Sequence, residues 1–214
     1  MMHRLLLAAA AAATVSAACA QVVAPVPSRT LRTAKAEVVS MAIAPKGDRI
    51  LVGLSKGAEV IDLETGKKLF ALPYSEDGGT AAYYTAFNDN GEYAVLIGHS
   101  GKRVVYSMKT GKPEPSLQQH RWVPDPRAVK AMGLDMGNST FDRFYQQAEA
   151  KYGDLVMRAT VHGAVEVVGA DGKALQKLEF PENKDQHHRS PLLIREGQLL
   201  LGTDDGRVLF HALD

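Results

Sequence analysis

Short apolar runs separated by polar residues and glycines make up most of the chain after about residue 38. Representative runs are residues 50–52, 94–97 and 199–201, which consist of valine, isoleucine, leucine and alanine. Runs of this length, bounded by glycine-containing turns, are typical of β-strands joined by hairpins. The pattern therefore predicts an all-β protein.

The runs recur with a nearly constant spacing. Four glycines of one unit return in the next after 44 or 45 residues: Gly47 and Gly91, Gly53 and Gly98, Gly57 and Gly101, Gly66 and Gly111. Turns need the positive φ that glycine adopts readily, which accounts for its recurrence. Two further units follow, and the first of them carries about 17 extra residues between Gly137 and Gly153. A single four-stranded unit cannot bury both of its faces, so we expect the units to stack.

Two segments carry a family resemblance. Residues 60–67, VIDLETGK, resemble the end of a WD-repeat β-propeller blade, and residues 201–208, LGTDDGRV, are similar to a blade of quinoprotein-type propellers. The resemblance covers nearly all of residues 29–214 and implies a propeller architecture, but blades of this kind serve many functions. The tryptophan of the WD signature is replaced by Ile61, Tyr106 and His211. Since the chain has a single tryptophan, it lacks the tryptophan girdle of quinoprotein dehydrogenases, and we expect no cofactor.

We accordingly predict a small β-propeller of about four four-stranded blades over residues 38–214. The last unit has strands near 191–195, 198–202 and 207–212 but no outer strand. Residues 29–33, in a leader of residues 21–37, have the pattern of the missing strand and would close the last blade, as propellers commonly do. One alternative is an unstructured leader. A second is a half-ring completed by another copy of the chain, which would make a homodimer.

An insertion spans residues 138–152. Ser139 and Asp142 form a capping-box pattern, and apolar side chains follow it at helical spacing. These are Phe141, Phe144, Tyr145, Ala148 and Tyr152. The spacing predicts one inserted amphipathic helix over about residues 140–152. Its aromatic stripe, Phe141, Phe144 and Tyr145, either packs on its own blade or binds a partner.

The N-terminal residues have the pattern of an export signal. A basic start is followed by an apolar run over residues 5–15 and by small residues up to Ala20, which predicts a signal peptide over residues 1–20. An A-x-A site favours cleavage before Gln21, whereas cleavage before Cys19 would leave a cysteine for lipid attachment, as in bacterial lipoproteins. The predicted location is the periplasm or the outer membrane, with secretion as an alternative, and a lipid anchor would be the only membrane attachment.

The loops that join second to third strands, and those between blades, are predicted to share one face of the propeller. They carry most of the chain's histidines and several acidic residues. The candidate binding residues are His99, His162, His187, His188, Asp204, Asp205 and Trp122, with Tyr74, Glu76 and Asp77 on the same face. The spacings of metal sites are missing, so we predict a polar binding face and not a metal centre.

Composition and motifs narrow the function. With 25 basic against 24 acidic residues, the chain lacks the concentrated positive charge that nucleic acids require. The sequence has no nucleophile elbow, phosphate-binding loop or dinucleotide fingerprint. We therefore expect a non-catalytic, exported propeller that serves as a scaffold for a protein partner in the cell envelope. The alternative is a propeller that binds a small molecule or performs metal-dependent hydrolysis.

Overall fold

The computed structural model describes residues 22–123, 147–160, 163–179 and 190–214. These residues form β-strands connected by short turns, with one short 3-10 helix. The strands are β1 (Arg29–Arg32), β2 (Val38–Ile43), β3 (Arg49–Leu54), β4 (Ala58–Asp62), β5 (Lys68–Leu72), β6 (Tyr84–Phe87), β7 (Tyr93–Ile97), β8 (Arg103–Ser107), β9 (Glu149–Tyr152), β10 (Leu155–Ala159), β11 (Ala164–Val168), β12 (Ala174–Glu179), β13 (Leu192–Arg195), β14 (Gln198–Gly202) and β15 (Arg207–Ala212), and the helix is η1 (Pro115–Leu117).

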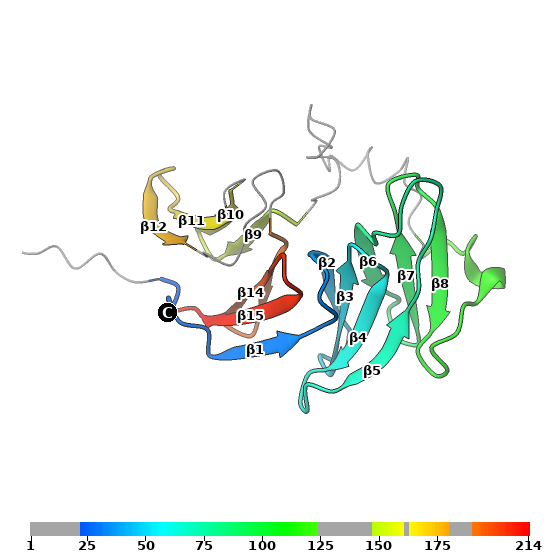
Figure 1. Ribbon diagram of the computed structural model, residues 1–214. Coiled ribbons are helices and arrows are strands. Elements are labelled where there is room, and N and C mark those ends of the chain that lie inside the picture. Colours follow the sequence, from blue (N-terminus) through cyan, green and yellow to red (C-terminus); the bar gives the residue numbers. More distant parts are fainter. Residues whose placement is uncertain (1–21, 124–146, 161–162, 180–189) are drawn as a thin grey trace, which may run out of the picture.

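The strands make four antiparallel sheets, in each of which consecutive strands are neighbours. Blade 1 is β2-β3-β4-β5, blade 2 is β6-β7-β8, blade 3 is β9-β10-β11-β12, and blade 4 is β13-β14-β15 with β1 added at its edge (Figure 1). Antiparallel meanders of this kind are the blades of a β-propeller. The predicted all-β, propeller-like architecture is confirmed.

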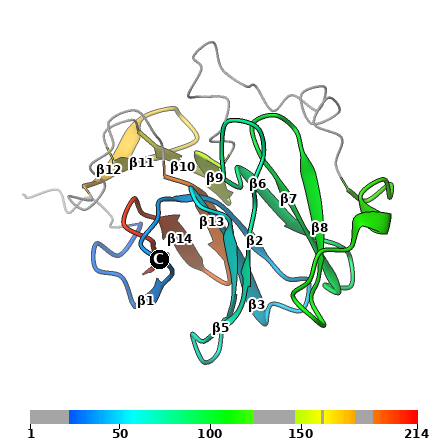
Figure 2. The ribbon, with the colours of Figure 1, turned by 45° about the vertical axis from the view of Figure 1, so that its right-hand side comes forward.

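The blades stack face to face through shared hydrophobic clusters, in the order 3, 4, 1, 2 (Figure 2). Buried members include Met157 and Leu201 between blades 3 and 4, Phe210 and Ile50 between blades 4 and 1, and Leu51 and Leu96 between blades 1 and 2. Among the described residues, no hydrophobic cluster joins blade 2 to blade 3. The described part of the chain is therefore an arc of four blades, and the half-ring completed by a second copy stays a prediction.

The leader completes blade 4, as predicted. β1 lies antiparallel to β15, with Leu31 opposite Val208, and the Leu31 side chain is buried in the cluster between blades 4 and 1. Further upstream, Val23 pairs with Leu213, and the side chain of Gln176 on blade 3 bonds to the backbone of Val22 and Val23. The two ends of the described chain thus lie side by side.

Arginines connect neighbouring blades on the face that carries the β2–β3, β4–β5 and β6–β7 turns. Arg29 donates to the carbonyl of Leu63, Arg195 Nη2 donates to the carbonyl of Gly47 at 2.7 Å, and Arg49 Nη2 donates to the carbonyl of Gly91 at 3.2 Å. Each bond joins a charged donor on one blade to a turn of the next. Charge-assisted bonds are stronger than neutral ones, so these contacts fix the turns relative to one another.

The predicted helix of residues 140–152 is wrong in its described part. Residues 149–152 form β9, in which Ala150 and Tyr152 face the core between blades 3 and 4, as does Ala148 just before the strand. A spacing of four residues fits a helix of period 3.6 and also a strand of period 2, so the pattern was ambiguous here. Among the described residues there is no α-helix, and in that same part no helix is long and apolar enough to cross a membrane.

Two further details of the blades differ from expectation. β9, the first strand of blade 3, is formed by residues 149–152, so the last part of the predicted insertion belongs to the blade itself. In blade 2, Pro113 bridges to Tyr106 and the Glu114 N–H donates to the carbonyl of Val105. This short segment occupies the place of a fourth strand beside β8.

Candidate functional site

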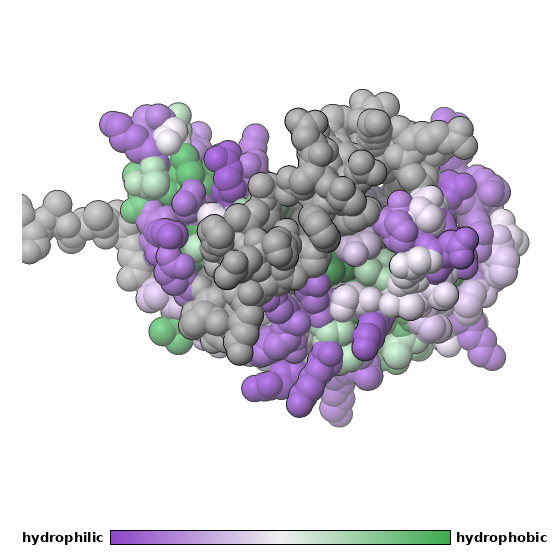
Figure 3. All heavy atoms as spheres, turned by 45° about the horizontal axis from the view of Figure 1, so that its top comes forward, coloured by the Kyte–Doolittle hydropathy of each residue, from purple (hydrophilic) through white to green (hydrophobic). Residues whose placement is uncertain are grey.

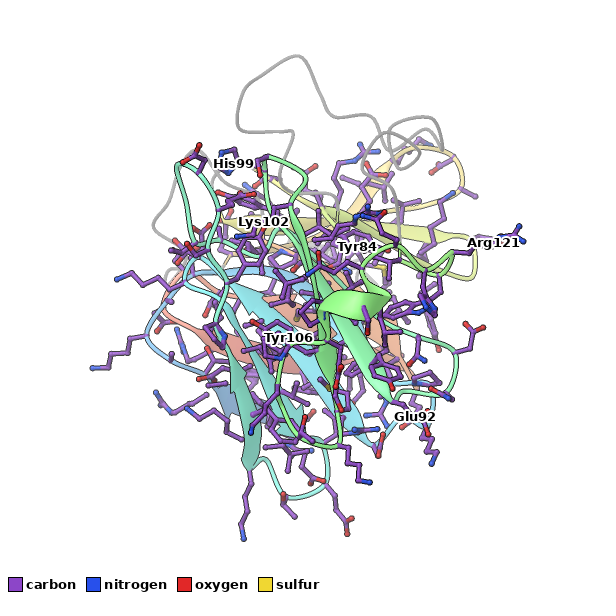
Figure 4. All side chains as sticks on the ribbon, turned by 90° about the vertical axis from the view of Figure 1, so that its right-hand side faces the viewer. Tyr84, Glu92, His99, Lys102, Tyr106 and Arg121 are labelled. Carbon is purple, nitrogen blue, oxygen red and sulfur yellow. The ribbon has the colours of Figure 1, made fainter. Side chains whose placement is uncertain are left out.

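A network of polar side chains lies at one end of blade 2. It consists of Tyr74 and Glu76, from the connection between β5 and β6, and His99 and Ser100, from the turn between β7 and β8; we call it the His99 cluster. Figure 4 shows His99 at this end of the blade, with Glu92 at the opposite end. The cluster therefore belongs to the face on which the sequence placed His99, Tyr74 and Glu76.

Glu76 is the centre of the cluster, and its side chain is only 1% exposed. Its Oε2 accepts hydrogen bonds from the Tyr74 hydroxyl at 2.9 Å, from the Ser100 N–H at 3.1 Å and from the Ser100 hydroxyl. Its Oε1 lies 2.5 Å from Nδ1 of His99. A buried carboxylate is costly unless donors surround it, and here donors from two separate loops do so.

Tyr74 connects the cluster to the backbone of blade 2. The Gly98 N–H donates to its hydroxyl oxygen at 2.8 Å, and the carbonyl of Lys102 lies 2.7 Å from the same oxygen. Burial, the hydrogen bond to Glu76 and the charge of Glu76 all raise the pKa of Tyr74 well above its ordinary value. Tyr74 therefore remains a protonated donor throughout the physiological pH range.

His99 is accessible to solvent, with 34% of its side chain exposed. Because the facing carboxylate of Glu76 can only accept, the proton of a neutral His99 ring resides on Nδ1. The ring packs against the turn at Gly78 and Gly79, where an added Cβ on Gly79 would lie 3.4 Å from Cε1 of His99. Glu76 and this turn together set the orientation of the imidazole.

Gly98 has no side chain because the cluster occupies the space. A Cβ at this position would overlap the carboxylate of Glu76 and would lie 2.5 Å from the Tyr74 hydroxyl oxygen. Its repeat equivalent Gly53 is crowded in the same way, by the side chain of Ser40 and the carbonyl of Ala82. These two recurring glycines thus serve close packing, whereas most of the others in the repeat, such as Gly57, have positive φ.

The geometry of the His99 cluster fits a rigid, polar contact surface. The Ser100 hydroxyl bonds to Glu76 and not to His99, so the adjacent pair does not form a nucleophile with its base. Within the described ranges, no three histidine, cysteine or acidic side chains are grouped as metal ligands. The cluster provides an imidazole of fixed orientation, carried on two loops that are joined by hydrogen bonds.

The other predicted site residues are distributed as follows. Asp205 lies in the turn between β14 and β15, where it binds Arg207 Nε at 2.9 Å and the hydroxyl of Thr203 at 2.6 Å. Partial burial acts to raise the pKa of Asp205, but these bonds outweigh it, and the pKa is lowered. Asp204 precedes it in the same turn. Trp122 packs, half-buried, on the face of blade 2 that points away from blade 1.

Several predicted residues fall outside the described residues. They are Cys19, Phe141, Phe144, Tyr145, His162, His187 and His188. The structure brings His99, Tyr74 and Glu76 together, but not Asp204 and Asp205 with them. Ser100, which contacts Glu76, is not among the residues predicted from the sequence. The feature that could have indicated it is a hydroxyl in the β7–β8 turn, on the same predicted face as the loop that carries the carboxylate of Glu76.

Comparisons with known proteins bear on the fold. No protein-family model and no curated protein matches the chain. Among solved structures, the chain is similar to U3-55K (13% identity, TM-score 0.36) and to the WD40 repeats of RRP9 (13%, 0.38), covering 81% and 88% of this chain but 50% and 55% of those chains. It is also similar to the Cps50 (Swd1) β-propeller domain of Myceliophteria thermophila (13%, 0.36), covering 88% of this chain and 75% of that one.

The chain thus spans about half the length of the first two structures it matches. All three similarities are too weak to identify a function. The class of the protein follows from its own strand topology: four meander sheets, stacked face to face, with the N-terminal strand added to the last. This is a β-propeller-like arrangement of blades.

Proposed function

We propose that this protein is an exported, non-catalytic β-propeller that serves as a protein-interaction scaffold in the periplasm or cell envelope. The observation that carries the proposal is that hydrogen bonds join its turns to one another. On one face of the stacked blades, arginines join the turns of neighbouring blades; on the opposite face, the buried Glu76 ties two loops together. Loops held on a rigid scaffold bind partners without the entropic cost of ordering them.

The outer strands add surfaces suited to a protein partner. Leu69 on β5 and Leu175 on β12, both on the fourth strand of a blade, are 42% and 43% exposed. Edge strands with exposed apolar side chains can pair with an extended segment of another protein. Elsewhere the surface in Figure 3 is mostly hydrophilic, with apolar residues in separate patches, one of them at the blade 3 end. Separate apolar patches of this kind favour contact with a partner at a few sites over contact along one continuous apolar surface.

The proposal of export is supported by the signal-like N-terminus. Both cleavage sites, before Cys19 and before Gln21, lie upstream of Val22, whose backbone bonds to Gln176 and Asp214. Either cut would leave the contacts of the leader intact. Mass spectrometry of the protein purified from its native host tests this proposal. A diacylated Cys19 or a free Gln21 supports export, and a chain that retains residues 1–18 contradicts it.

The scaffold proposal is tested by cross-linking in the native envelope followed by affinity purification. We expect a partner at stoichiometric yield, and weaker recovery from a His99→Ala variant, which alters an exposed contact. Lys173→Ala, at an exposed turn of blade 3, is the matched control. Failure to recover any partner above the level of an unrelated exported protein would contradict the scaffold. Stoichiometric zinc in the purified protein, lost in His99→Ala, would favour the metal-dependent alternative.

A further inference from the structure

A cavity of about 420 Å³ lies at the junction of blades 1 and 2, at the end opposite the His99 cluster. Three turns surround it: the β2–β3 turn, the β6–β7 turn and the turn after β8. Its lining includes the charged residues Lys46, Arg49, Glu92 and Lys109. We call this cavity the basic pocket.

The pocket has one fixed cation and two exposed ones. Arg49 is held in place by its bond to the carbonyl of Gly91 and by an ion pair with Asp48, in which Nε and Oδ2 are 3.2 Å apart. Lys46 and Lys109 are exposed, and within the described part of the chain neither ammonium group pairs with a carboxylate. These two ammonium groups are therefore available to a ligand.

A single carboxylate lines the pocket. Glu92 Oε2 accepts a hydrogen bond from the side-chain amide of Asn90 at 2.9 Å, which holds it on its own turn. With Asp48, the ion-pair partner of Arg49, the pocket region has three cations and two anions, so its net charge is positive by one. Tyr93 and Met108 add an apolar contribution to the lining. A complementary ligand would carry at least one negative group beside an apolar portion.

We propose that the basic pocket binds an acidic segment of a protein partner, with a carboxylate placed between Lys46 and Lys109. The proposal rests on the scaffold function proposed above and names the chemistry of its partner. The lining comes from turns of two blades and the pocket is open to solvent, so an extended chain can cross it without being enclosed. Glu92 repels a second carboxylate on its own side and so favours a segment in which acidic residues are spaced apart.

Fluorescence anisotropy with two labelled hexapeptides tests the proposal. One alternates glutamate with glycine, and the other carries glutamine in place of glutamate. We expect the acidic peptide to bind more tightly and to lose affinity as salt increases, because exposed charge pairs are screened. In the double variant Lys46→Gln, Lys109→Gln, its Kd should rise by about fivefold, the effect of losing two exposed ion pairs.

Two variants guard against misinterpretation. Lys35→Gln combined with Lys56→Gln removes the same charge at exposed sites near the opposite ends of the blades, and should leave the Kd unchanged. Glu92→Gln should lower the Kd about twofold, because an exposed repulsive charge is removed. A gain of affinity cannot result from partial unfolding. Equal losses in both lysine pairs would instead indicate nonspecific attraction and overturn the proposal.

Two more outcomes would overturn it. One is equal binding of both peptides; the other is a citrate affinity that matches that of the acidic peptide, which would assign the pocket to small carboxylates. Neither outcome bears on the scaffold function. That function fails separately, if cross-linking recovers no partner from the envelope.

Discussion

Replacement of Leu31 by alanine tests whether the leader strand is part of the folded unit. The Leu31 side chain is 4% exposed and belongs to the hydrophobic cluster between blades 4 and 1, together with Leu63, Val208 and Phe210. Truncating a buried leucine to alanine costs about 2–5 kcal/mol, depending on how far the cavity collapses. We expect a loss of about 3 kcal/mol in the free energy of unfolding.

The loss should be visible by thermal and urea denaturation of the mature protein. For a chain of this size, 1 kcal/mol corresponds to about 2–4 °C, so the Tm should fall by about 6–12 °C. Arg32→Ala is the matched control, because Arg32 is the next residue of the same strand and its side chain is exposed. It should change the free energy of unfolding by less than about 0.5 kcal/mol.

Hydrogen exchange adds a local readout. The amides of β15 that face β1 should exchange faster in Leu31→Ala than in Arg32→Ala, since local opening of the blade edge exposes them. If both variants unfolded at the same temperature with the same exchange pattern, β1 would not belong to the cooperative unit. The proposed closure of blade 4 would then be refuted.

Three further predictions concern single contacts. Gly98→Ala should destabilise the protein by about 1–3 kcal/mol in urea melts, because a methyl group overlaps Glu76; an unchanged midpoint would contradict the close packing. Burial lowers the pKa of His211 below its ordinary 6.5, so the unfolded chain binds the proton more tightly, and stability should fall as the pH drops below about 6.5; the pH dependence should flatten in His211→Phe. Arg195→Met should cost about 1.5–3 kcal/mol by losing the charged bond to Gly47, and a stable variant would show the bond to be dispensable.

The repeat made much of the fold predictable. The predicted second and third strands of the last unit, residues 198–202 and 207–212, match β14 and β15, and the predicted outer strand at 29–33 matches β1 within one residue. Because each repeat unit contributes equivalent strands, aligning the units by their glycines predicts the strand positions of one unit from those of the others. The replacements for the signature tryptophan, Ile61, Tyr106 and His211, occupy equivalent positions, since all three are buried on the third strands of their blades.

The errors arose where the pattern was ambiguous or the contact was long-range. Ala148 and Tyr152 are four residues apart, a spacing that suits a helix and a strand alike. In the His99 cluster, the shared face of Glu76 and His99 was predictable from the loop positions. The contact between them was not, because it depends on the conformation of two loops 23 residues apart and on the absence of a side chain at Gly98.

The pairing of β1 with β15 has a kinetic consequence. Thr30 lies opposite Leu209, so β1 cannot pair until β15 has been synthesised. Contacts between residues so distant in sequence form slowly, since the intervening chain must be ordered or searched first. Until then the edge of blade 4 is unpaired and open to other chains. The pairing of β1 with β15 therefore follows the synthesis of all the described strands between them.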